Sequence, residues 1–294
     1  MDQVTALHTA ARRYCQAAFS EWMHRYSDLQ AAGKVEVHCS VQPGWKYSDA
    51  AYKTFPRYRI AQAIQVEVER IMPSSVDSLE EMGELLVQAS QVPEERLNAQ
   101  LNNPLASNAL ATEAHDYQAH IRALMETDLS TIEPLPYRRA LSAPESERLW
   151  DLLRSRWGVG DDHYWFPLRK GDPPPDVVAF HEDLFSKWQG GELLRQALTE
   201  RGIERAFQLS EFFPSDPDYE IEISILEPTY ARGGEQYFTS ETADWLVYAS
   251  HESSITLAGD LLVEHFTTRW PDWKARTYQG PYSTPDLRGT WETK

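Results

Sequence analysis

The stretch that decides the fold runs from Tyr219 to Ala258. It reads Tyr219-Glu-Ile-Glu-Ile-Ser-Ile225, then Gln236-Tyr-Phe-Thr239, Asp244-Trp-Leu-Val-Tyr-Ala-Ser250 and Ile255-Thr-Leu-Ala258. Apolar residues at every second position of the first run predict a half-buried strand that continues to Ile225. The last two runs are β-branched or aromatic and only a few polar residues separate them, so they predict a hairpin. A final helix is expected from Asp260.

Apolar spacing also predicts most of the other elements. It indicates helices at residues 3–31, 78–89 and 105–127, one after the Ser142–Glu145 capping box, and one at 192–201. It indicates strands at 34–41 and 206–212 and a short helix at 93–101. Pro56 is expected to open a helix that ends at Pro73, and Asp176 to cap a helix that reaches Trp188.

Prolines at 134 and 136 interrupt the helical pattern and suggest a boundary between two regions. We therefore expect a mostly helical region at residues 1–140 and an α+β region at 141–294, or one continuous domain. The predicted fold class is α+β, with an antiparallel sheet of about four or five strands flanked by helices.

Charge is the most informative bulk property. The chain of 294 residues has 28 basic and 45 acidic residues and a net charge of −17. Residues 141–294 alone hold 15 basic and 27 acidic residues, a net of −12. Since proteins that bind nucleic acid neutralise phosphates with Lys and Arg, we expect no nucleic-acid partner. No run reaches the ~18 apolar residues of a membrane span and no signal-peptide pattern opens the chain, so a cytoplasmic protein without membrane contact is expected.

The sequence predicts neither a metal nor a cofactor. Cys15 and Cys39 lack any metal or redox spacing and are expected to be reduced packing residues. His251-Glu252 is not followed by the second His of a zinc-protease helix, and His163 beside two aspartates is expected to be solvated loop charge. The chain also has no Gly-x-Ser-x-Gly elbow and no glycine-rich phosphate loop in the right context.

A polar corner separates the two strands of the expected hairpin. It contains His251, Glu252, Ser253 and Ser254. These residue types form good turns, and turn formation alone would account for them. A loop on a rigid scaffold that combines an imidazole, an acid and hydroxyls could also bind a polar ligand or do acid–base chemistry.

An acidic stripe follows the strand at Tyr219. It consists of Glu220, Glu222 and Glu227, preceded by Asp216 and Asp218. The stripe is either the solvated face of the strand or a surface for a protein rich in Lys and Arg. Because Glu220 and Glu222 alternate with the apolar face, reversing their charge is expected to leave the fold intact.

Two segments resemble a group of bacterial proteins of about this length. They are Tyr52-Lys-Thr-Phe-Pro-Arg-Tyr58 and Asp244-Trp-Leu-Val-Tyr-Ala-Ser-His-Glu-Ser-Ser254. The resemblance spans both halves of the chain, implies no named activity and transfers no catalytic residue.

These observations favour an interaction protein over an enzyme. The expected function is that of a cytoplasmic bacterial protein that binds a basic protein partner with its acidic C-terminal region, such as an immunity or antitoxin protein. The alternative is a hydrolytic or small-molecule enzyme that uses His251, Glu252 and Ser253. Whether the chain is an enzyme stays open at this point.

Overall fold

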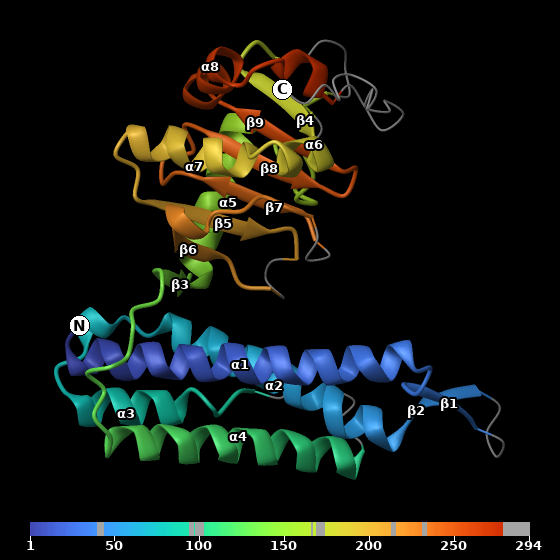
Figure 1. The fold of residues 1–294 in the computed structure, drawn as a ribbon, viewed down its shortest axis with the longest axis vertical. Coiled ribbons are helices and arrows are strands. Elements are labelled where there is room, and N and C mark those ends of the chain that lie inside the picture. Colours follow the sequence, from blue (N-terminus) through green and yellow to red (C-terminus); the bar gives the residue numbers. More distant parts are fainter. Residues whose placement is uncertain are drawn as a thin grey trace, which may run out of the picture. The chain divides into compact units, whose positions relative to one another are not determined.

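A computed structural model describes residues 1–39, 44–93, 97, 103–165, 167–168, 174–212, 216–230 and 234–278. Most of the expected helix at 93–101 lies outside these ranges. The chain divides into two compact units, Met1–Leu135 and Pro136–Lys294. Helices form the first unit, and an antiparallel sheet flanked by helices forms the second, so the fold class is α+β as predicted (Figure 1).

The first unit is built on long helices. The hairpin of β1 (Glu36–Cys39) and β2 (Gly44–Tyr47) joins the antiparallel helices α1 and α2, and α4 packs against α2 (Figure 1). The helices are α1 (Gln3–Ala31), α2 (Asp49–Arg70), α3 (Leu79–Gln88) and α4 (Pro104–Met125), with a 3₁₀ turn η1 (Pro73–Ser75) after α2. Their buried faces form one apolar core, which includes Leu7, Ile64, Leu86, Tyr117 and Ile121.

The start of α2 differs from the prediction. Pro56 does not open the helix but lies inside it and is buried. The helix begins at Asp49 because Ser48 acts as its N-cap, with its hydroxyl accepting a hydrogen bond from the amide of Ala51 at 3.1 Å. The segment Tyr52–Tyr58 is therefore helical.

Buried polar groups connect α1 to α2. The Arg12 guanidinium lies 3.4 Å from the carboxylate of Glu69, and both side chains are almost completely buried. Burial lowers the pKa of His8 to about 4, so its neutral ring donates from Nε2 to the carbonyl of Val68 at 2.9 Å. Cys15 is buried beside these groups and is a free thiol, as expected, whereas the side chain of Cys39 lies outside the described structure.

The second unit contains a seven-stranded sheet, larger than the four or five strands expected. All pairs are antiparallel, in the order β3-β6-β5-β7-β8-β9-β4. The hairpin predicted from the last two apolar runs is confirmed as β8–β9. The strands are β3 (Arg138–Ala140), β4 (Val177–His181), β5 (Arg205–Ser210), β6 (Tyr219–Glu222), β7 (Gln236–Thr239), β8 (Leu246–Ser250) and β9 (Ser254–Ala258).

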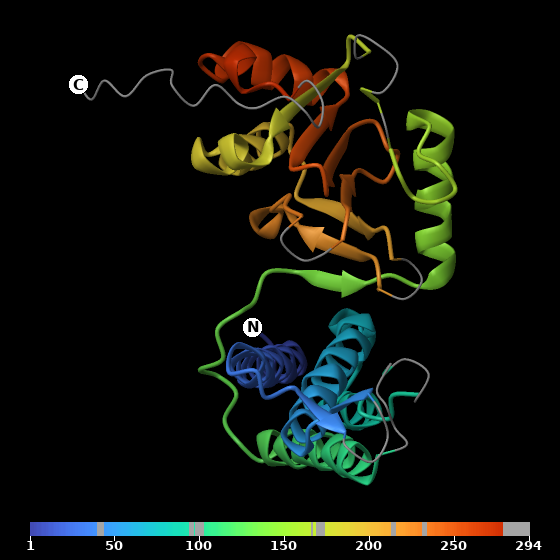
Figure 2. The ribbon, with the colours of Figure 1, turned by 90° about the vertical axis from the view of Figure 1, so that its right-hand side faces the viewer.

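Helices cover both faces of this sheet. Figure 2 shows α5 (Ala143–Trp157) on one side, with α7 (Gly190–Glu200) and α8 (Asp260–Arg269) on the other. The capping box predicted at Ser142 and Glu145 is present at the start of α5. The remaining elements are α6 (Glu182–Lys187) and the 3₁₀ turns η3 (Ile223–Ile225) and η4 (Trp273–Arg276).

Two predicted elements of this unit were wrong. Residues 177–181 form the buried strand β4 instead of a helix capped by Asp176, and α6 begins only at Glu182. A strand that is buried on both faces has no alternation, so its apolar run can be mistaken for a buried helix. The strand that starts at Tyr219 ends at Glu222, where the chain turns into η3.

A buried carboxylate connects α5 to the sheet. Asp218 accepts hydrogen bonds from Trp150 Nε1 at 3.0 Å and from the amide of Ser210 at 2.8 Å. The Trp150 ring in turn lies edge-on to Tyr237 and 4.2 Å from the ring of His163. These contacts fix the end of β5, from which the next residue, Glu211, leads into the candidate site.

Candidate functional site

The polar corner is a three-residue link between β8 and β9. Ser250 pairs with Ser254, and residues 251–253 make the turn. Ser253 has a positive φ of 58° and donates its amide to the carbonyl of Ser250 at 3.1 Å. The Ser250 hydroxyl accepts a hydrogen bond from the amide of Glu252 at 3.2 Å. The turn interpretation therefore accounts for Ser253, whose left-handed backbone fits a three-residue hairpin loop.

The turn presents His251 to a carboxylate that the sequence did not single out. Glu235 directly precedes β7, and the pairing of Gln236 with Ala249 places it opposite the end of β8. Its side chain is fully buried and accepts a hydrogen bond from His251 Nδ1. Tyr248 donates its hydroxyl to the same carboxylate, and the hydroxyl of Ser250 lies 3.3 Å from it.

This arrangement orients the imidazole of His251. Nδ1 donates to a buried acceptor, while about half of the side chain, 49%, stays exposed. Among the residues that the structure describes, no hydrogen bond engages Nε2. A buried carboxylate that accepts a hydrogen bond from one ring nitrogen fixes the tautomer of the imidazole. The other nitrogen can then take up a proton or accept a hydrogen bond.

A second carboxylate, Glu211, lies beside this pair. Its amide donates to the carbonyl of Glu235 at 3.2 Å. Burial raises the pKa of Glu211, and the negative charge of Glu235 raises it further. Oε2 of Glu211 is shielded from solvent and has no hydrogen-bond partner within the described part of the chain. The site thus contains two close carboxylates, and one oxygen of Glu211, Oε2, lacks a donor among the described residues.

Aromatic rings surround the two acids. The rings of Tyr164 and Tyr230 have centroids 6.3 and 6.2 Å from the ring of His251. The negative charge of Glu211 raises the pKa of Tyr164. Phe212 is 47% exposed and lies so close to Gly234 that a Cβ there would meet its ring at 2.5 Å. We call the set Tyr164, Glu211, Phe212, Tyr230, Glu235 and His251 the acidic-aromatic face.

The other residues of the corner are placed differently. Glu252 accepts a hydrogen bond from the hydroxyl of Tyr278 at 3.1 Å. Ser254 is buried in β9, and no hydrogen bond in the described structure joins Ser253 to His251. Neither Glu252 nor Ser253 is therefore hydrogen-bonded to His251 within the described structure.

His163 is also more constrained than the sequence suggested. It was expected as solvated loop charge, yet its ring lies against Trp150 and its Nδ1 donates to the carbonyl of Glu211 at 3.1 Å. Tyr237 donates its hydroxyl to the carbonyl of His163. This residue supports the backbone of the site.

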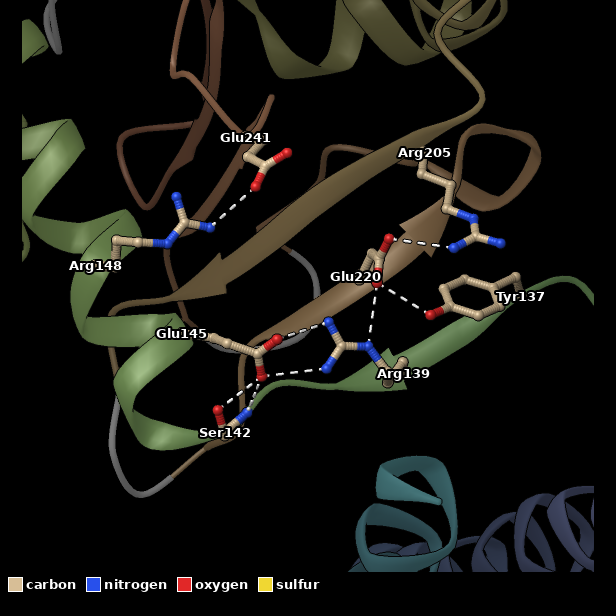
Figure 3. Close-up of polar contacts among 8 residues, drawn as sticks. All are labelled: Tyr137, Arg139, Ser142, Glu145, Arg148, Arg205, Glu220 and Glu241. Carbon is tan, nitrogen blue, oxygen red and sulfur yellow. Dashed lines mark hydrogen bonds and ion pairs between the residues drawn. The ribbon is translucent and has the colours of Figure 1, made fainter. Parts of the chain in front are cut away.

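The acidic stripe does not form a continuous free surface. Glu220 is ion-paired with Arg139 at 3.1 Å and Arg205 at 3.3 Å and accepts a hydrogen bond from Tyr137 at 3.0 Å (Figure 3). Glu222 accepts from the amide of Tyr137 at 3.0 Å and from the hydroxyl of Ser224.

The third acid of the stripe and the two aspartates that precede it have separate environments. Asp218 is buried, Asp216 is exposed before β6, and Glu227 is exposed beyond η3. Of the acids at 220, 222 and 227, only Glu227 is an exposed acid without an ion pair in the described structure.

Neither a metal-binding group of side chains nor a membrane-spanning helix is found in the part of the chain that the structure describes. No group of three or more His, Cys, Asp or Glu side chains there could hold a metal ion. Its helices also fall short of the length and apolar character needed to cross a bilayer.

Sequence reasoning found His251 but missed Glu211 and Glu235. Each acid stands next to a strand end, where acidic residues are common in loops, and only strand register brings them together.

A comparison with protein-family models finds no match, and neither the curated proteins nor the solved structures contain one. The case for function therefore depends on this geometry and on the charge of the chain.

Proposed function

We propose that the chain is a bacterial cytoplasmic interaction protein that binds a basic protein partner, as an immunity or antitoxin protein does. The partner contacts the acidic-aromatic face and brings a Lys or Arg side chain to it. The charge of the chain supports the proposal, since the net of −17 favours encounter with positively charged proteins.

The observation that carries the proposal is the pair of carboxylates, Glu211 and Glu235, behind an exposed imidazole and aromatic rings. Tyr, Phe and Trp are enriched where protein interfaces bind most strongly, and a cation gains from aromatic faces and nearby carboxylates together. Glu211 as a whole is only partly buried, so a Lys or Arg side chain of a partner can pair with its carboxylate.

The test is capture of partners from a lysate of the organism that encodes the chain. Wild-type protein should retain a protein rich in Lys and Arg, and the variant with both Glu211→Gln and Tyr230→Ala should lose it. Glu227→Gln, an exposed acid outside the face, serves as the control and should retain the partner. If the double variant and the wild type dissociated from the captured partner at the same rate, the acidic-aromatic face would not be the binding surface.

A second function is favoured by one specific observation, the hydrogen bond between His251 Nδ1 and the buried Glu235. A His held in this way can act as a general base at Nε2, and Glu211, whose pKa burial raises, can supply a proton. Such a site would hydrolyse a small polar substrate. Turnover of p-nitrophenyl acetate or p-nitrophenyl phosphate that His251→Ala abolishes would support it, and equal rates for both proteins would exclude it for these substrates.

A further inference from the structure

A pocket lies within the first unit, whereas the acidic-aromatic face belongs to the second. It has a volume of about 550 Å³ and lies between the C-terminal half of α1 and the first two turns of α2 and α4. This volume is within the range of roughly 300–1,000 Å³ of small-molecule sites. The segment Tyr52–Tyr58, which the proposed function leaves unused, contributes three of its lining residues, Lys53, Thr54 and Arg57.

The pocket is lined by more cations than acids. Arg25, Lys53 and Arg57 line it together with a single acid, Asp28. This excess contrasts with the composition of the whole chain, in which 45 acidic residues outnumber 28 basic ones. Ala50 and Leu105, in the first turns of α2 and α4, also line the pocket, and the positive ends of helix dipoles favour an anion.

An indole ring holds the two guanidiniums in place. Arg25 and Arg57 have Cζ atoms 4.4 and 4.6 Å from the centroid of the Trp22 ring. Trp22 Nε1 and Arg57 Nη1 both donate to Oε2 of Glu113, at 2.9 and 3.0 Å, and the side chain of Glu113 is only 5% exposed. Stacking and a shared buried acceptor therefore fix these groups before any ligand arrives.

The cations keep unused donors. Arg57 uses Nη1 for Glu113 and Asp116, and Arg25 uses Nη2 for Glu21. Three carboxylates thus face the two guanidiniums and formally neutralise them. The charge available to an anion is therefore that of Lys53, which has no ion pair or hydrogen bond with any residue that the structure describes. Asp28 disfavours a ligand with charge spread over several anionic groups.

We propose that this pocket binds a small organic anion, held through one carboxylate or phosphate group by Lys53 and the free edges of Arg25 and Arg57. Guanidinium groups bind such oxygens in pairs, and an ammonium adds a point charge. Carboxylates and phosphates share this chemistry, so the experiment must separate them.

The experiment is titration calorimetry of the full chain with sodium acetate, which carries a single carboxylate, and, separately, sodium phosphate, at ionic strength held constant with sodium chloride. We expect saturable binding of at least one anion, weakened at least tenfold in Lys53→Ala. Lys34→Ala, an exposed lysine of the same unit outside the pocket, should bind like the wild type. Binding of acetate alone identifies a carboxylate site, and binding of phosphate alone a phosphate site.

Two outcomes would overturn the proposal. One is the absence of saturable heat from either anion up to about 20 mM, a concentration at which sites of millimolar affinity are well occupied. The other is equal affinity of wild type and Lys53→Ala. Circular dichroism of both variants should match the wild type, because neither lysine side chain is paired within the described structure.

Discussion

At the scale of single residues, Asp218 links ionisation to stability. Burial raises its pKa from 3.8 to about 7, although Ser210 and Trp150 donate hydrogen bonds to it. The folded chain therefore binds this proton more tightly than the unfolded chain. The contribution of this tighter proton binding to the free energy of unfolding is complete below pH 3.8 and is lost as the pH rises to about 7.

We predict that ionisation of Asp218 lowers the free energy of unfolding by about 4 kcal/mol between pH 4 and pH 8. The slope is about 1.4 kcal/mol per pH unit. Asp218→Asn cannot ionise and should lack this fall, although it is less stable at low pH. Urea unfolding of both proteins across this range measures the difference. Parallel pH profiles for the two proteins would contradict the assignment.

Gly259 is a second residue whose backbone constrains the fold. Its φ is +98°, and a Cβ would lie 2.7 Å from the carbonyl oxygen of Asp244. We predict that Gly259→Ala lowers the free energy of unfolding by about 2–4 kcal/mol, because left-handed strain adds to a clash with backbone. Gly33→Ala is the control, since Gly33 also has a positive φ but no atom within 4 Å, and should cost only about 1 kcal/mol. Equal losses in thermal unfolding would rule out the clash.

At the scale of elements, Glu220 connects β6 to its two neighbours. It lies between Arg139 of β3 and Arg205 of β5, and only 17% of its side chain is exposed (Figure 3). The expectation that charge reversal would leave the fold intact assumed a solvated side chain, whereas Glu220 is mostly buried and ion-paired. A lysine there would place three cations together.

We predict that Glu220→Lys lowers the free energy of unfolding by about 2–4 kcal/mol, as expected when one partner of a half-buried ion network is replaced by a like charge. Glu227→Lys, at an exposed position outside the network, should change it by less than about 0.5 kcal/mol. Chemical denaturation of both variants gives the comparison. Similar stabilities for the two would mean that the network contributes nothing.

The β8–β9 turn provides a test of the role of Ser253. Its φ of 58° is costly for any residue with a Cβ and free for glycine. We predict that Ser253→Gly raises the free energy of unfolding by up to about 1 kcal/mol, and that partner binding is unchanged because the hydroxyl does not touch His251. Loss of binding in a stable variant would instead make Ser253 part of the functional surface.

At the scale of the whole molecule, each unit has its own core. One apolar cluster lies entirely before residue 135, and another, which includes Trp150, Leu209 and Tyr248, lies entirely after it. We predict that fragments 1–135 and 136–294 fold separately, because neither loses a core residue to the cut. Cooperative melting of each fragment, followed by circular dichroism, tests this. A fragment without a cooperative transition would show that its core is incomplete alone.

Periodicity and register explain what could be predicted from the sequence. The long helix at residues 3–31 and the hairpin around His251 carry strong repeats and were predicted correctly. Strand β4 was missed because Val177 to Phe180 are buried on both faces and show no alternation. Most of the candidate site was missed for another reason. Glu211 and Glu235 meet His251 only through pairing across β5, β7 and β8, and composition or spacing within one segment cannot reveal such pairing.

The order of strands in the sheet has a consequence for synthesis on the ribosome. The strands that emerge first, β3 and β4, occupy the two edges of the sheet, and β4 pairs with β9, near the end of the described chain. A nascent chain that has not yet reached Ser254 leaves β4 with no strand beside it. Such distant pairing slows folding and exposes apolar strands to association with other chains. Completion of the sheet must therefore follow translation of β9, which makes the last hairpin the step that commits the newly made protein to its native state.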